Sequence, residues 1–278
     1  MTEHQTEAVT LRGVPETLLI PLYFRAIESM RSDALIRDER AVELVNRISY
    51  DFGQVRKIRM SEGNKVARIM LTREMDRYAW DFLSRHPDSV VVHIGCGLDS
   101  RFERVDNGRV EWYDLDLPDV IELRRRLIGG EGGRYHLLGC SVLEDDWLEA
   151  VKVHSRRPFL FLADNVLVFF TEAQAKRLVQ TLRKNFPGSE LVFDAWAPFF
   201  VWLANLQLSS SKFGGLLQWG LWSSQTLESW DEGIHMLGQW GFFDQPEPRM
   251  DPFRWIAPIF NLFKPMRILH FQLGEAAA

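Results

Sequence analysis

A glycine-containing loop follows a short apolar run in the segment 91–99, which has the sequence Val-Val-His-Ile-Gly-Cys-Gly-Leu-Asp. An apolar run of this length that ends in glycines is typical of a buried β-strand. In an open α/β sheet, ligands bind outside the carboxyl ends of the strands, and glycines let the backbone approach a ligand without a Cβ in the way. We therefore expect Gly95 and Gly97 to belong to a ligand site, although a Gly-x-Gly after a strand also occurs as a plain turn.

Two carboxylates end the next apolar run, in the segment 113–118 with the sequence Tyr-Asp-Leu-Asp-Leu-Pro. We expect only one of Asp114 and Asp116 to face the ligand. We choose Asp116, which is nearer the strand end, where a carboxylate can accept hydrogen bonds from both ribose hydroxyls of a nucleoside. The alternative is that Asp116 caps the helix that begins near Pro118.

The loop favours a nucleoside without phosphates. A dinucleotide fingerprint, Gly-x-Gly-x-x-Gly, needs a third glycine where this chain has Ser100. It also needs the N-terminus of a full helix, whereas the helical segment after this loop is short. Asp99 would repel a phosphate but tolerate the cationic sulfonium of S-adenosylmethionine. We therefore expect S-adenosylmethionine as the cofactor, and a nicotinamide oxidoreductase remains as an alternative.

The elements that position the loop follow from the spacing of the apolar runs. Five strands are predicted, over residues 89–95, 110–115, 135–138, 159–163 and 191–194. Helices are predicted between them, including 116–127 and 171–185, and this alternation is typical of a parallel sheet with crossover helices. A helix over 225–237 and two strands near 241–243 and 266–273 complete the chain. The fold class is thus α/β, a doubly wound, mostly parallel, seven-stranded, Rossmann-like sheet, as in class I methyltransferases.

We expect one domain, residues 1–278, with four parts. They are an N-terminal helical cap (1–87), a cofactor-binding core (88–195), an aromatic lid inserted after strand five (196–235) and C-terminal strands that complete the sheet (236–278). Ligand pockets are mostly apolar and aromatic, so we expect the lid to cover the substrate through Trp196, Phe199, Phe200, Trp202, Trp219 and Trp222. A hydrophobic core or a dimer contact is the alternative for these residues. Ser209–Ser211 and Gly214–Gly215 would let the lid move.

Composition excludes several classes of protein. The net charge of -5 and the pI near 5.9 give no basic face for nucleic acid. The N-terminus has no apolar signal-peptide core, and the longest apolar stretch, 196–206, is too short to span a bilayer. Two cysteines fit reduced thiols in a cytoplasmic enzyme better than a disulfide framework, and they give no metal cluster. The oligomeric state stays open, with a homodimer as one alternative.

Three segments in order resemble the leucine carboxyl methyltransferase family, and especially its bacterial branch of polyketide-synthesis O-methyltransferases. They are residues 91–102, 113–118 and 163–171. The resemblance implies an S-adenosylmethionine-dependent O-methyltransferase of secondary metabolism that acts on a small, aromatic or polyketide-like acceptor. A protein C-terminal carboxyl methyltransferase and a cofactor-binding scaffold without activity remain as alternatives.

The resemblance also implies roles for individual residues. Arg73 falls where the family has an arginine that binds the methionine carboxylate of the cofactor, which suits a bidentate guanidinium. Gly95 matches the glycine that approaches the cofactor, Asp116 the acid that binds the ribose, and Asp164 an acid near the amino end of the cofactor. The family commonly has Asp-Leu at the adenine, where this chain has Ser141 and Val142.

Histidines offer no clear general base. A carboxylate acceptor is already ionised at neutral pH and needs no base, whereas a phenol would benefit from one. His93 lies inside a predicted strand and is expected to belong to the core. His235, on the predicted helix 225–237, is the remaining candidate, against a structural or solvent-facing role. We therefore expect methylation of a carboxylate or an acidic hydroxyl, driven mainly by positioning.

Overall fold

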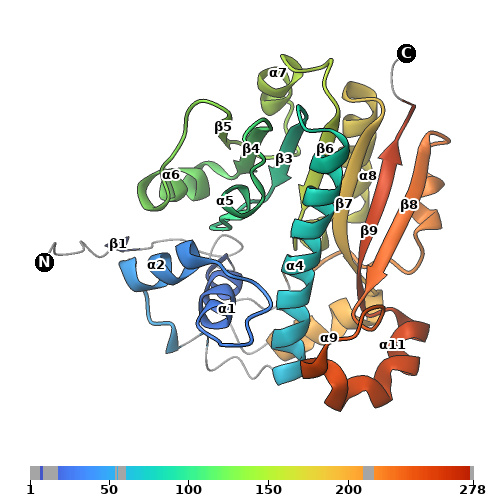
Figure 1. Ribbon diagram of the computed structural model, residues 1–278. Helices are drawn as coiled ribbons and strands as arrows, with labels where there is room; N and C mark the ends of the chain where they lie inside the picture. Colours follow the sequence, from blue (N-terminus) through green and yellow to red (C-terminus); the bar gives the residue numbers. More distant parts are fainter. Residues whose placement is uncertain (1–6, 9–17, 54, 56–60, 209–215, 276–278) are drawn as a thin grey trace, which may run out of the picture.

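A seven-stranded sheet runs through the centre of the molecule (Figure 1). The computed structural model describes residues 7–8, 18–53, 55, 61–208 and 216–275. In spatial order, the strands are β5 (Tyr135–Gly139), β4 (Glu111–Asp116), β3 (Val90–Ile94), β6 (Phe159–Ala163), β7 (Ser189–Trp196), β9 (Met266–Leu273) and β8 (Ile234–Gly241). The other strands run in one direction, and β9 runs antiparallel to them. The predicted α/β fold class is confirmed, and the direction of winding reverses between β3 and β6, where such sheets bind ligands.

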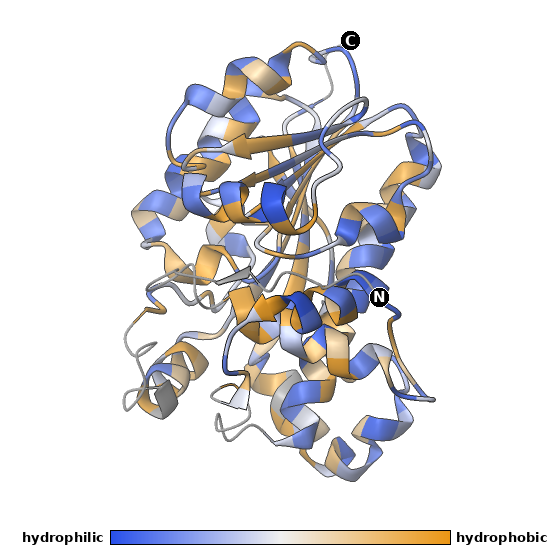
Figure 2. Ribbon diagram, turned by 90° about the vertical axis from the view of Figure 1, so that its left-hand side faces the viewer, coloured by the Kyte–Doolittle hydropathy of each residue, from blue (hydrophilic) through white to orange (hydrophobic). Residues whose placement is uncertain are grey.

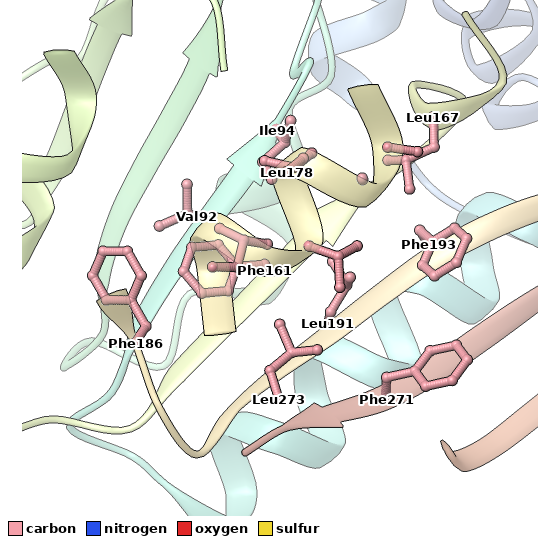
Figure 3. Packing of buried hydrophobic residues seen from close by; sticks show 14 of the residues in the cluster. Val92, Ile94, Phe161, Leu167, Leu178, Phe186, Leu191, Phe193, Phe271 and Leu273 are labelled. Atoms are coloured by element: carbon pink, nitrogen blue, oxygen red, sulfur yellow. The ribbon is translucent and has the colours of Figure 1, made fainter. Parts of the chain in front are cut away.

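Helices cover both faces of the sheet, which gives a three-layer structure (Figures 1 and 2). One face packs against α4 (Glu62–Arg85), α5 (Arg101–Val105) and α6 (Pro118–Leu127). The other packs against α7 (Asp146–Lys152) and α8 (Glu172–Asn185). On the α8 face, Leu178 of the helix belongs to the same apolar cluster as Phe161 and Phe193 of the strands (Figure 3). Both faces of the central strands are therefore apolar, as expected for a parallel sheet.

Local sequence signals account for where the helices begin. Thr171 and Gln174 form a capping box at the start of α8, in which each side chain bonds to the backbone of the other residue. Pro118 is the first residue of α6, where its missing N–H costs no hydrogen bond. Ser61 accepts from the Asn64 N–H and so caps α4.

Two N-terminal helices stand beside the carboxyl ends of the strands. α1 (Leu19–Ser29) and α2 (Glu39–Arg47) share an apolar cluster of their own (Figure 1). A short pair of strands, β1 (Glu7–Ala8) and β2 (Ile48–Ser49), adjoins them. α4 also falls within the predicted cap (1–87), but it belongs to the helical layer on the sheet. Within the described residues, none of the helices is long and apolar enough to cross a bilayer.

The C-terminal third differs from the prediction. The helix expected over 225–237 is wrong: α10 ends after one turn, at Gln225–Glu228, and β8 begins at Ile234. A turn separates them, in which the Asp231 carboxylate accepts from the Gly233 N–H. The strand expected near 241–243 is therefore β8, several residues earlier, whereas β9 begins and ends as predicted.

Three further helices were not predicted. α9 (Pro198–Leu208) follows β7, and the 3₁₀ segment η3 (Pro248–Ile256) and α11 (Ala257–Phe263) lie between β8 and β9. The expected lid hinge at Ser209–Ser211 and Gly214–Gly215 lies outside the described residues.

Candidate functional site

A cavity of about 220 Å³ opens at the carboxyl ends of β3, β4, β6 and β7. It brings together most of the residues predicted to bind a cofactor, although they are spread over some 70 positions of the chain. These residues are Gly95, Gly97, Asp99, Asp116, Ser141, Val142 and Asp164. The remaining predicted residue, Arg73, does not line the cavity.

The glycine loop is shaped for close approach to a ligand. Gly95 and Gly97 have φ of 64° and 50°, in the left-handed region that favours glycine. At Gly95 an added Cβ would also overlap the side chain of Val166, which lines the cavity as well. The loop is therefore intolerant of side chains, and its backbone forms the cavity wall.

Asp116 joins the end of β4 to this loop. Its Oδ2 accepts from the Gly97 N–H at 2.7 Å and its Oδ1 from the Leu117 N–H at 2.7 Å. Burial raises the pKa of Asp116, although the two backbone donors oppose the shift. Each oxygen keeps a further lone pair for a ligand. The alternative role as a helix cap is not seen, because α6 has no side-chain cap.

A buried arginine fixes the carbonyl groups of the same loop. Arg124, on α6, donates to Gly97 O at 2.9 Å and to Asp99 O at 2.7 Å. The same guanidinium is paired with Asp114, which is fully buried. Asp114 thus holds the scaffold, whereas Asp116, the last residue of β4, lines the cavity, as its position at the strand end led us to expect.

The Asp99 carboxylate is bound by arginines. It lies 2.9 Å from Arg104 and 3.2 Å from Arg101, and Arg25 of α1 is 3.8 Å away. Burial would raise the pKa of Asp99, but the three guanidinium groups outweigh it and hold the pKa well below its usual range. Arg25 also donates to Leu98 O at 2.9 Å. Asp99 therefore lines the cavity mainly as an anchor that ties the loop to the N-terminal helices.

His93 is in the core, as expected, but it also borders the cavity. Its Nε2 lies 3.2 Å from Arg101 Nη1, and its Nδ1 lies 3.1 Å from Asp114 Oδ1. Arginine can only donate, so Nε2 accepts and Nδ1 carries the hydrogen that bonds to Asp114. Neither nitrogen is free to take a proton from a ligand.

Two carboxylates face each other across the ends of β6 and β7. Asp164 Oδ2 accepts from Arg101 at 2.7 Å. Within the described residues, the hydrogen bonds to Asp194 come from two neutral donors, the Asn165 N–H at 2.5 Å and the Trp196 indole at 2.8 Å. Burial and the negative charge of Asp164 raise the pKa of Asp194 to about 6. Sequence analysis missed Asp194, although it ends a predicted strand as Asp116 does.

Arg68, and not Arg73, is the α4 arginine at the cavity. Its guanidinium stacks on Trp196, 5.7 Å from the ring centroid, and among the described residues it makes no ion pair within 4 Å. Five helical residues turn the side-chain direction by about 140°, so the two arginines face apart. Arg73 instead lies 3.5 Å from Glu247. Arg73, which was predicted to bind the cofactor, therefore lies outside this cavity, and Arg68 lines it.

The aromatic residues of the expected lid do not line the cavity. Trp219 is buried in the core, which was the alternative for this segment, and Trp196 bonds to Asp194. Phe200 is half-buried, and the others are more than half exposed, namely Phe199, Trp202 and Trp222. His235 is exposed on β8, at the edge of the sheet, and is also outside the cavity.

The apolar wall of the cavity comes from elsewhere. Phe24 of α1 and the pair Phe169 and Phe170 after β6 supply its aromatic rings. These residues carry no sequence signal that separates them from core residues.

Comparison with known proteins agrees with this geometry. The sequence profile described as leucine carboxyl methyltransferase matches residues 19–183. The chain belongs to this family. It is 37% identical to the tetracenomycin polyketide synthesis O-methyltransferase TcmP of Streptomyces glaucescens, over 86% of this chain and 87% of that one. It is 28% identical to the S-adenosyl-L-methionine-dependent methyltransferase dpfgK of Gibberella zeae, over 90% and 89%.

Solved structures share the fold of this leucine carboxyl methyltransferase family member at low identity. A DUF574 family protein from Streptomyces avermitilis superposes with a TM-score of 0.59 at 14% identity, over 92% of this chain and 96% of that one. An O-methyltransferase family protein from Burkholderia thailandensis gives 0.50 at 12% identity, over 86% and 71%. The methyltransferase fold predicted from the strand pattern is therefore confirmed.

Proposed function

We propose that the protein is an S-adenosylmethionine-dependent O-methyltransferase that acts on a small, aromatic or polyketide-like acceptor, at a carboxylate or an acidic hydroxyl. The observation that carries the proposal is the Asp116 carboxylate, bonded to Gly97 in a loop whose backbone forms the cavity wall. The identities of the two curated relatives as methyltransferases support it.

The cavity suits a cationic nucleoside. Asp116 would hold the ribose, Ser141 and Val142 would border the adenine, and Asp164 would face the amino group. Arg68 would bind the methionine carboxylate, because it is the cation of the cavity without an ion pair among the described residues. When bound, S-adenosylmethionine supplies a methyl group on a positively charged sulfur. The carboxylates Asp116, Asp164 and Asp194 give the cavity a negative potential that favours this charge.

The residues of the chain act on the acceptor mainly by positioning it. Phe24, Phe169 and Phe170 would pack on a flat acceptor and keep water away from the reacting oxygen. His93 is bound on both nitrogens, so a carboxylate or an acidic hydroxyl, which is ionised without a base, is the acceptor group that fits. We also propose a cytoplasmic location, which rests on the free thiols of Cys96 and Cys140.

Calorimetry with S-adenosylhomocysteine, S-adenosylmethionine and NAD tests the cofactor. We expect the native protein to bind the first two and not NAD. Asp116→Asn should weaken binding roughly 10- to 100-fold, which corresponds to the loss of charged hydrogen bonds worth about 1.5–3 kcal/mol. Asp119→Asn is the matched control, because Asp119 also bonds to the next N–H but is exposed outside the cavity.

Transfer of a labelled methyl group to a panel of aromatic acids and phenols tests the reaction. Undiminished affinity of Asp116→Asn protein for S-adenosylhomocysteine would refute the assigned site. A native protein that binds the cofactor but labels no member of the panel would instead favour a scaffold or another acceptor class.

A further inference from the structure

Two carboxylates line the cofactor cavity at corresponding positions of neighbouring strands, β6 and β7 (Figure 1). Asp164 directly follows β6, and Asp194 is the residue of β7 at the same level, because Ala163 pairs with Phe193. Arg101 donates to Asp164 at 2.7 Å and so balances its charge. Asp194 forms no ion pair with any described residue. The two acids therefore differ in how their charges are compensated.

The contacts of Asp194 leave room for a further donor. Its Oδ1 accepts from the Asn165 N–H at 2.5 Å and its Oδ2 from the Trp196 indole at 2.8 Å. The residue is 3% exposed, so water solvates its charge poorly. Each carboxylate oxygen can accept a second hydrogen bond. Both oxygens are thus fixed in place, and each keeps a lone pair for a ligand in the cavity.

The charged groups that act on Asp194 come from two elements. Asp164, after β6, and burial raise the pKa of Asp194 to about 6, and Arg68, on α4, opposes this shift. On the other side of β7, the strand β9 places the apolar residue Ile268 opposite Asp194. Positive charge at Asp194 is therefore in short supply, and a cation between the two carboxylates would relieve their repulsion.

Arg68 supplies the complementary charge in the same part of the cavity. Its guanidinium lies over the Trp196 ring, 5.7 Å from the centroid, and the same indole bonds to Asp194. The charges of Asp194 and Asp164 both act on Arg68, although neither carboxylate pairs with it directly. One cation and two carboxylates around a cavity are the complement of an α-amino acid group, whose carboxylate suits a guanidinium and whose ammonium suits carboxylates.

We propose that Asp194 in its ionised form, together with Asp164, binds the ammonium group of the cofactor. The inference rests on the proposed function, because the amino acid is the methionine part of S-adenosylmethionine. Protonation of Asp194 removes a charge that the ammonium needs, so cofactor binding and ionisation of Asp194 favour each other. The affinity for the cofactor is therefore expected to fall as the pH falls through the range in which Asp194 gains its proton.

Calorimetry with S-adenosylhomocysteine and methylthioadenosine between pH 5 and pH 7 tests the proposal on the native protein. The first ligand carries the amino acid part without a sulfonium charge, and the second lacks the amino acid part. Amino acid carboxyl and ammonium groups keep their charges in this range. Titration of Asp116 affects both ligands alike, because both carry the ribose. The experiment contains no acceptor, so an ammonium carried by an acceptor does not contribute.

We expect the affinity for S-adenosylhomocysteine relative to methylthioadenosine to fall about 10-fold from pH 7 to pH 5. A carboxyl group with a pKa of about 6 is ionised to roughly nine-tenths at pH 7 and to roughly one-tenth at pH 5. A ratio of affinities that stays constant, or that rises as the pH falls, would overturn the inference. This arm needs no variant.

Variants assign the effect to Asp194. Asp194→Asn should make the ratio independent of pH in this range and lower it roughly 10-fold at pH 7, because a charged hydrogen bond is lost. The matched control is Glu190→Gln, which should keep the native pH dependence, because Glu190 is a buried acid of β7 outside the cavity.

A purely structural role of Asp194 predicts a different result. If Asp194 only ties Asn165 and Trp196 to the strand, Asp194→Asn weakens both ligands equally and its ratio of affinities still falls with pH, and the inference is wrong. A native protein that binds both ligands with a constant ratio overturns the inference and leaves the proposed function intact. A native protein that binds neither ligand refutes the proposed function.

Discussion

Replacement of Asp194 by asparagine is expected to stabilise the cofactor-free protein increasingly as the pH rises. The pKa of Asp194 is raised from 3.8 to about 6 by burial and by the charge of Asp164. A carboxyl group whose pKa is higher in the folded state binds more protons there than in the unfolded state. The folded protein therefore loses stability between these two pKa values and regains none above them.

The size of the effect follows from the width of this window. A shift of about two pKa units corresponds to roughly 3 kcal/mol, of which roughly 2 kcal/mol falls between about pH 4 and about pH 7.5. Asparagine does not titrate, so the stability of the variant relative to the native protein should rise by that amount over this range. Asparagine also has one acceptor oxygen where Asp194 uses two, for Asn165 and Trp196. That loss is the same at every pH and drops out of the comparison.

Urea denaturation at constant ionic strength measures the difference at each pH. Glu190→Gln is the control, because Glu190 is also a buried acid of β7, but Arg85 and His270 lower its pKa to about 2 against the effect of burial. The stability of Glu190→Gln relative to the native protein should fall by about 1 kcal/mol as the pH rises over the same range. If the stability of Asp194→Asn relative to the native protein does not change with pH, or falls as the pH rises, the argument that Asp164 and burial disfavour the Asp194 charge is refuted.

Two further predictions concern residues that the structure reassigns. Arg68→Met should weaken the binding of S-adenosylhomocysteine roughly 10- to 100-fold but leave the binding of methylthioadenosine, which lacks the amino-acid part, unaffected. Arg73→Met should change neither affinity. Equal losses of affinity for both ligands in Arg68→Met would contradict the assigned role of Arg68. His235→Ala should retain native turnover in the labelled-methyl assay, because His235 is exposed on the edge strand and outside the cofactor cavity. Loss of turnover with intact cofactor binding would restore His235 as a candidate base.

The cofactor side of the site was predictable because its signals are local. The loop after β3 and the acid at the end of β4 each depend on a few neighbouring residues, and the position at the strand end was enough to prefer Asp116 to Asp114. The ends of parallel strands meet at one edge of the sheet, so residues that end strands come together in space. Asp194 satisfies the same rule and was available to the same reasoning.

The helical residues of the site were not predictable in this way. α4 packs against the sheet on one side, and η3 and α1 also contact this helix. The first half of α4 therefore carries apolar residues, such as Val66, Ile69 and Leu71, around much of its circumference. A helix buried on several sides has no single apolar stripe, and the sequence then does not reveal which arginine faces the ligand. Only the packed structure separates Arg68 from Arg73.

The lid and His235 were misplaced for a related reason. An edge strand has one neighbour and is partly exposed on both faces, so β8 lacks the alternating pattern of a strand with one buried face. A bulge between Met236 and Gly238 interrupts its pattern further. The tryptophans between Trp196 and Trp222 are alike in the sequence, which does not indicate that Trp219 is a core residue and Trp202 an exposed one.

Charge pairing separates scaffold from ligand site in this molecule. Arg25 and Arg124 each bind a carbonyl of the glycine loop, Arg101 bonds to His93 beside it, and each of the three is paired with an aspartate that the chain itself supplies. Such arginines hold the cofactor loop in place whether or not a ligand is present. Arg68 lines the cavity and makes no ion pair within 4 Å among the described residues, although the charges of Asp194 and Asp164 act on it. Because burial costs more for a cation without a paired carboxylate than for a paired one, Arg68 is the position where an anionic group of a ligand would contribute most to binding.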